Sequence, residues 1–225
     1  MCVNDVNVIL EEVRIISRVH REKQSKIKMK KILDSARQVF CRKGFLAVTM
    51  QDIIDECGIS RGGIYVYFAS VDEIFFEVMK QRNREKFSVV NKSVQSLEPF
   101  EVVLSDYFSR QKERLLNFKK SLFRAYCEYI FSKPKNAVEA FRDIQFAHLQ
   151  KTIVSILMLG VHQGIIVNKD NGAKIRILAN HFIVAIDGLS VLALAEALTE
   201  EIIDEQFGIL FEMVQNNYTV GQHKM

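Results

Sequence analysis

The chain has 225 residues, 48% of them hydrophobic, so it can bury a substantial core. This excludes a disordered tail and a miniprotein that depends on disulfides. The net charge of +4 is uneven: between residues 21 and 43, nine lysines and arginines face two acids, Glu22 and Asp34. We expect a polyanionic partner to meet this part of the chain.

Helix-breaking residues are rare. Pro99 and Pro134 are the only prolines and glycine is sparse, so long helices are permitted almost everywhere. The N-terminus carries acids among its apolar residues, unlike a signal peptide, and polar or glycine residues interrupt the apolar stretches 152–167 and 181–198. We predict an all-α protein without a membrane segment.

The cysteines and histidines show no metal-ligand pattern. Four scattered cysteines form no CxxC pair, which is typical of buried thiols in a reducing compartment and predicts a cytoplasmic protein. His148, His162 and His181 have neither i, i+4 spacing nor a neighbouring cysteine. We expect no metal and no cofactor.

The first 43 residues predict two helical stretches joined by a basic one. Apolar residues recur every three or four positions in residues 3–19 and again in residues 32–40, and the second stretch ends at Lys43 and Gly44. Residues 20–31 between them are polar and basic. The first stretch can cover apolar surface on its own subunit or contact a partner.

Residues 49–75 contain capping and turn residues that are typical of short helices. Thr49 and Ser60 suit N-caps, and Gly58 suits the tight turn between them. Ser70 and Glu73 form a capping-box pattern at the start of a long helix. Such short helices around a glycine turn, with a longer one leading away, are typical of a helix-turn-helix domain joined to a larger part.

The rest of the chain predicts further helices, broken at prolines, asparagine and glycines. They cover residues 99–117, 119–131, 135–163, 173–198 and 200–217. Residues 164–167 could form a strand, but the run is too short to build a sheet, and we predict a loop there.

The segment TMQDIIDECGISRGGIYVYFASVDEIF, residues 49–75, closely resembles the DNA-binding signature of the TetR/AcrR family, and Ala36, Phe40, Gly44 and Phe45 match that family's first helix. The resemblance covers roughly residues 29–79. It implies an N-terminal three-helix helix-turn-helix domain followed by a helical ligand-binding and dimerisation domain. We expect an extension over 1–25, the DNA-binding domain over 26–70 and the second domain over 71–225.

Candidate base contacts lie at the start of the expected recognition helix. Arg61 can offer its planar guanidinium to guanine O6 and N7. Gly62 and Gly63 each weaken a helix by about 1 kcal/mol, so we interpret them as a close approach of backbone to DNA, with tolerated poor propensity as the alternative. The resemblance assigns phosphate contacts to Tyr65 and Tyr67.

Other candidate DNA contacts are helix ends and a basic arm. Thr49 suits both a cap and a phosphate contact, whereas Ser60 suits a cap better than a base reader. The family usually has a lysine just after the serine that caps the fourth helix, where this chain has Val71. Lys28 and Lys30, within a basic run that also holds Lys26 and Lys31, can compensate by tracking phosphates, or can form a plain solvated face.

The helix predicted over 173–198 is apolar on nearly every face, with small residues such as Gly188 among the large ones. We expect it to pair with residues 149–161 across a two-fold axis and form a four-helix dimer interface. Asp187 in this apolar run is interpreted as a satisfied helix polar group or an interface contact.

Aromatic and polar residues on the internal helices are candidate ligand contacts, although each is equally explained as ordinary core. The set is Phe108, Gln111, Leu115, Phe123, Tyr126, Tyr129, Phe141, Gln145 and His148.

We therefore predict a regulator that binds a palindromic double-stranded operator as a homodimer and is released by a small-molecule effector; family habit suggests a repressor. Ligand binding would shift the helix that begins at Val71. Two alternatives stay open: a helical adaptor that uses the motif for protein contacts, and an all-helical enzyme dependent on Cys127 or His148, for which no catalytic arrangement is visible in the sequence.

Overall fold

The protein is described from a computed structural model that covers residues 3–167 and 172–218, with side chains for residues 14, 17–167 and 172–215. These residues contain no β-strand, so the predicted all-α class is confirmed. In chain order the elements are α1 Val3–Lys43, α2 Met50–Cys57, α3 Arg61–Tyr65, α4 Val71–Gln95, α5 Phe100–Leu116, the 3-10 turn η1 Phe118–Lys120, α6 Leu122–Ser132, α7 Lys135–His162, α8 Ala173–Leu194 and α9 Glu200–Tyr218.

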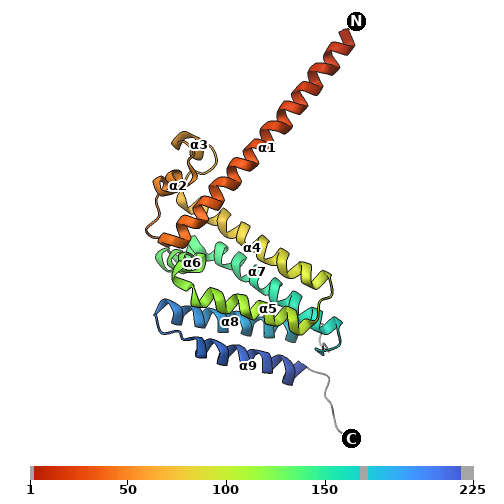
Figure 1. The fold of residues 1–225 in the computed structure, drawn as a ribbon, viewed down its shortest axis with the longest axis vertical. Helices are drawn as coiled ribbons and strands as arrows, with labels where there is room; N and C mark the ends of the chain where they lie inside the picture. The colour runs from red at the N-terminus through yellow and green to blue at the C-terminus, as the bar shows by residue number, and fades with distance from the viewer. Residues whose placement is uncertain (1–2, 168–171, 219–225) are drawn as a thin grey trace.

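Helix α1 is one continuous helix of 41 residues, since the polar stretch that we expected to join two helices is itself helical. Its N-terminal half projects away from the rest of the molecule (Figure 1). Every side chain from residue 17 to 30 is exposed except Ser25, which is half-buried. From residue 17 onward this part of α1 therefore does not cover its own subunit.

The C-terminal part of α1 packs with α2, α3 and the start of α4 around one apolar core. Ile32, Phe40, Ile53, Ile64 and Phe75 are fully buried in it. The helix periodicity of the sequence placed these residues correctly because a buried stripe must recur at the helical period.

The predicted caps are present, with one change. The Thr49 hydroxyl accepts a hydrogen bond from Asp52 N, the Asp52 carboxylate closes a capping box, and Gly58 adopts φ 61°. The Ser70 hydroxyl accepts from Glu73 N, as expected of a cap. The Glu73 carboxylate, however, accepts from Ala69 N and not from Ser70 N, so the reciprocal half of the predicted box is wrong.

Helices α4 to α9 stack side by side below this domain (Figure 1). Phe108 of α5, Phe182 of α8 and Phe207 of α9 stack ring against ring at the centre of a second core. Helix α7 packs along α8 of the same subunit and buries Ile153, Ile156 and Leu157 there. Residues 149–161 thus serve the subunit's own core, and our expectation that they cross a dimer axis is wrong.

Helices α7 and α8 are long and apolar enough to cross a membrane, judged on length and composition alone. Core helices pass the same test, and these two helices pack on each other. They are therefore only weak evidence for a membrane segment. The residues 164–167 form a turn and bends, as predicted.

Candidate DNA-binding face and ligand cavity

Helix α3 presents its first turn to solvent. The Ser60 hydroxyl accepts from Gly63 N at 3.2 Å and fixes the start of the helix, while Ile64 anchors it in the core. Arg61 is exposed, and in the described part of the chain it forms no ion pair or hydrogen bond; its guanidinium carbon lies 5.9 Å from the centre of the Tyr65 ring. A charged fork without an internal partner is available to an external acceptor.

The two glycines of α3 differ in what the fold requires of them. A Cβ on Gly63 would lie 2.9 Å from Ile59 Cγ2, so packing inside the domain already demands glycine there. A Cβ on Gly62 would meet nothing within 4 Å. Packing against Ile59 therefore explains Gly63, which is neither of the two interpretations considered for it, whereas only Gly62 keeps the interpretation of a close approach to a partner.

The remaining candidate DNA contacts lie around α3. Tyr65 is 43% exposed, while Tyr67 is half-buried against the core. Val66, which we did not single out, is 78% exposed beside them. Lys28 and Lys30 are exposed on α1, and Lys30 Nζ lies 3.8 Å from Asp34 Oδ2.

Thr49 is committed to its cap. Its hydroxyl donates to Asp52 Oδ2 at 2.8 Å, and its backbone N–H donates to the same oxygen at 2.9 Å. Hydrogen bonds from Lys43, and then from Thr49, lower the pKa of Asp52 to about 2. The start of α2 is therefore rigidly built and still exposed at Thr49.

Besides its apolar packing, α6 contacts the DNA-binding domain through one carboxylate. Glu128 accepts from Phe45 N at 2.6 Å, from Leu46 N at 3.1 Å and from Arg124 Nε at 2.8 Å. Gly44 has φ 80°, and a Cβ there would collide with this carboxylate. The sequence carried no signal for this contact, because Glu128 lies more than eighty residues from the loop that it binds.

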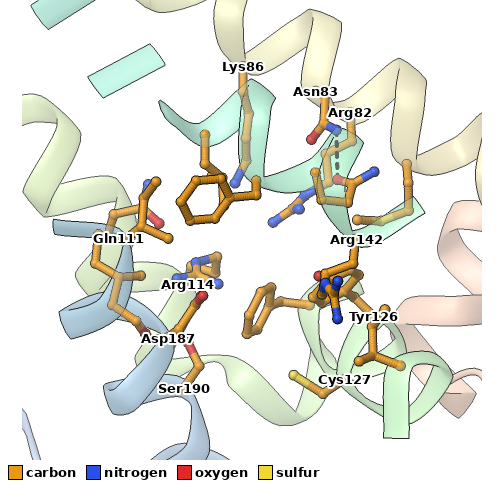
Figure 2. Close-up of a pocket in the computed structure, with 18 of the residues that line it drawn as sticks. Arg82, Asn83, Lys86, Gln111, Arg114, Tyr126, Cys127, Arg142, Asp187 and Ser190 are labelled. Carbon is orange, nitrogen blue, oxygen red and sulfur yellow. Dashed lines mark hydrogen bonds between the residues drawn. The ribbon is translucent and has the colours of Figure 1, made fainter. Parts of the chain in front are cut away.

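A cavity of about 270 Å³ lies between α4, α5, α6, α7 and α8 (Figure 2). Gln111, Phe123, Tyr126 and Gln145 from the predicted ligand set line it. His148 lines an adjoining cavity of about 310 Å³, which shares Gln111 with the first and reaches α1 at Arg37 and Cys41.

Four predicted ligand residues are not brought to these cavities. Phe108 is stacked in the second core, and Leu115 is buried in the same core. Tyr129 and Phe141 pack against Phe75, under the DNA-binding domain. These four face away because they lie on other sides of their helices, which residue type alone does not reveal.

Charged residues that we did not predict also line the first cavity. They are Arg82, Lys86, Arg114, Arg142 and Asp187. Burial, followed by repulsion from neighbouring arginines, lowers the pKa of Arg82 to about 9 and the pKa of Lys86 well below its ordinary 10.5. Burial also raises the pKa of Asp187, and that of Tyr126 to about 12. Our candidates were aromatic and polar residues of the internal helices, and these five charged residues were not among them.

Replacing Lys86 by Met should stabilise the unliganded protein by about 1 kcal/mol or more, since it removes a buried cation that has no acid beside it. The gain should shrink as pH rises toward 10.5, the ordinary pKa of lysine. Between the lowered pKa and that value the unfolded chain binds more protons than the folded one, so the wild type gains stability with pH. Urea unfolding at several pH values measures this.

Lys92→Met, at an exposed position of the same helix, is the control and should change little. An equal loss of stability in both variants would contradict the electrostatic account of the cavity.

The described residues form no metal-binding cluster, and two of their free thiols are buried. Among the described residues, no group of three His, Cys, Asp or Glu side chains could hold a metal ion. Cys57 and Cys127 are buried free thiols, and burial, then Asp187, raises the pKa of Cys127 to about 12, so it is a poor nucleophile.

A capped, exposed third helix on a helical body with an internal cavity is the arrangement found in helix-turn-helix DNA-binding proteins. Residues 32–78 match the family described as bacterial regulatory proteins, tetR family. The uncharacterised HTH-type transcriptional regulator YfiR of Bacillus subtilis is 27% identical over 150 residues, which cover 66% of this chain and 71% of YfiR. YerO of the same organism is 40% identical, but over 47 residues, 21% of this chain and 16% of YerO.

Solved structures share the fold. A TetR-family regulator from Mesorhizobium loti superposes with a TM-score of 0.68 at 18% identity, covering 87% of this chain and 98% of that one. A regulator from Saccharomonospora viridis, solved with choline, gives 0.61 at 20% identity and covers 88% and 100%. Residues 32–78 are thus similar to the DNA-binding domain of bacterial tetR-family regulators, and the described chain shares the fold of the solved regulators.

Proposed function

We propose that this protein is a cytoplasmic repressor that binds a palindromic operator as a homodimer and leaves it when a small molecule occupies the cavity. The observation that supports this proposal is that one helix, α4, connects the domain of the exposed helix α3 with the internal cavity. The start of α4 is buried in the DNA-binding core, and the same helix lines the cavity.

Met79 illustrates the link, because it is buried in the core of the DNA-binding domain and also lines the cavity. A ligand that shifts α4 would therefore tilt the domain that holds α3. A coupling of about 1–3 kcal/mol between the two sites would suffice for a useful switch. The choline bound to the Saccharomonospora viridis regulator supports a small-molecule effector as a class.

The dimer is proposed from an exposed apolar stripe on α8. Ile177, Val184 and Val191 are 54%, 68% and 54% exposed. His181 and Gly188 lie between them at helical spacing, and a Cβ on Gly188 would meet nothing within 4 Å. Such a stripe with a small residue at its centre suits close packing of a second helix. Helix α9 lies beside α8 and adds Ile209, which is 50% exposed (Figure 1).

Val184→Arg should convert the dimer to a monomer, because it would bury an unpaired charge in the proposed interface and raise the dimer Kd by ~100-fold or more. Sedimentation velocity over a range of concentrations measures this. Val89→Arg on α4, where Val89 is 43% exposed, is the matched control and should stay dimeric. A wild-type monomer at all concentrations would contradict the proposed dimer.

The test of function is selection of genomic DNA fragments by the purified protein. We expect enrichment of one palindromic site whose half-sites lie about one helical turn apart. Affinity should fall about a thousandfold or more between 50 and 200 mM salt if the basic end neutralises several phosphates. No enrichment, together with a protein partner bound regardless of salt, would favour the adaptor alternative.

A further inference from the structure

Three cationic side chains converge in the cavity without an acid to pair with them. Arg82 and Lys86 lie one turn apart on α4, and Arg114 of α5 points toward the same space (Figure 2). Within the described part of the chain, none of the three forms an ion pair or a hydrogen bond through its charged group, and Arg114 Nε is fully buried without a partner. Arg114 rests only on an aromatic face, 4.4 Å from the centre of the Phe123 ring.

The acids near the cavity do not neutralise these cations. Arg142, the fourth cation, is already paired with Asp143 at 3.2 Å. Asp187 is the only carboxylate among the described residues that line either cavity. It points toward Arg114 but forms no ion pair with it (Figure 2). Three unpaired cations therefore face one carboxylate, and the cavity carries an excess of positive charge.

The unused hydrogen-bonding group beside them is also a donor. Gln145 accepts at its Oε1 from Asn83 Nδ2 at 2.7 Å, which leaves its Nε2 buried and without a partner. Buried polar groups are nearly always satisfied, so an orphaned donor next to unpaired cations calls for an acceptor from outside the chain. The cavity is thus short of acceptors and rich in donors.

Apolar side chains also line the cavity. Phe123, Tyr126, Ile183 and Ile186 are among them. A ligand that fills the cavity must therefore combine a charged acceptor with an apolar body.

We propose that the cavity binds an amphipathic organic anion, whose carboxylate or phosphate head contacts Arg82, Lys86 and Arg114 and whose apolar body packs on Phe123 and Tyr126. The inference rests on the proposed sensor function and names the chemical class of its effector. A quaternary ammonium such as choline, bound by one structural relative, has the wrong charge for this cavity.

The position of the cations also places the anion between helices α4 and α5. Arg82 and Lys86 belong to α4, Arg114 belongs to α5, and all three line the adjoining cavity that reaches Arg37 and Cys41 of α1. An anion would remove the repulsion between α4 and α5 and draw the two helices together. Differential binding of this kind is what a ligand-driven switch requires.

The test measures binding to the full-length protein without DNA, by titration calorimetry below the critical micelle concentration of each probe. The probes are decanoate, decyl phosphate, decylammonium and decanol, which share one chain and differ in the head group. We expect an anion to bind at least tenfold more tightly than decylammonium or decanol. The two anions separate a carboxylate effector from a phosphate one. Equal binding of all heads, tighter binding of decylammonium, or no binding of either anion would overturn the proposal.

Variants of two of the three cations test whether the binding depends on them. Lys86→Met and Arg114→Met should each weaken anion binding at least tenfold and leave decanol unaffected, while the melting temperature does not fall. Arg84→Met, at an exposed position of α4, is the matched control and should bind like the wild type. Anion binding that survives both cavity variants would overturn the proposal. Because no DNA is present, a protein that binds anions but no operator would refute the proposed function and leave this inference standing.

Discussion

Arg61→Ala should lower operator affinity by about 10- to 100-fold and relax the sequence preference at one position of each half-site. Its exposed guanidinium stands on the first turn of α3 and forms no ion pair or hydrogen bond among the described residues, so beyond its approach to the Tyr65 ring at 5.9 Å the change removes only an external contact. A bidentate contact to a base is worth about 1–3 kcal/mol. Fluorescence anisotropy with the selected operator and with variants of each base pair measures both effects.

Two comparisons make this result specific to α3. Arg84→Ala removes an exposed arginine from α4 and should leave the affinity unchanged. The melting temperature of Arg61→Ala should stay close to that of the wild type, since the only internal contact of the Arg61 guanidinium among the described residues is its exposed approach to the Tyr65 ring. If Arg61→Ala bound the operator as tightly as the wild type, the assignment of α3 as the reading helix would be wrong.

Glu128→Ala should lower the free energy of unfolding by about 2–3 kcal/mol. It leaves the N–H groups of Phe45 and Leu46 without their acceptor and Arg124 Nε without its carboxylate. Hydrogen bonds to a charged group are each worth more than neutral ones, and unsatisfied buried donors add a desolvation cost. Chemical denaturation of the purified variant measures the loss.

The same change should loosen the hold of α6 on the DNA-binding domain. Glu128→Gln keeps one acceptor oxygen and should recover part of the stability. Glu139→Ala, an exposed acid at the start of α7 that lies 4.0 Å from Arg142, is the control and should cost little. A Glu128→Ala variant as stable as this control would show that the loop at Gly44 is held by other contacts.

Local features of the fold followed from the sequence because they depend on neighbouring residues. Thr49, Gly58 and Ser60 cap or turn the chain within three or four positions, and Ile53 and Ile64 are buried at the helical period. The helical conformation of the long polar stretch of α1 was not predicted. No tertiary contact requires a helix there, and charged residues suit both a helix and a linker.

The cavity could be predicted only in part, because it depends on how five helices are rotated about their axes. Tyr126 and Tyr129 are both aromatic residues of α6, yet one faces the cavity and the other faces Phe45. The cations of α4 and α5 meet in space although more than twenty-five residues separate Lys86 from Arg114. The spacing of these residues along the chain does not predict that they lie close together.

The length of α1 has a geometric consequence. Its C-terminal part lines the adjoining cavity at Arg37 and Cys41, while the side chains of residues 17–30 are exposed except for the half-buried Ser25. At a rise of about 1.5 Å per residue, the arm from Ser17 to Lys43 is about 40 Å long. A tilt of about 5° at its base moves its far end by about 3.5 Å, more than the length of a hydrogen bond. A rotation of α1 that is too small to disturb the packing around Phe40 therefore produces a larger displacement at the lysines in the exposed part of the helix.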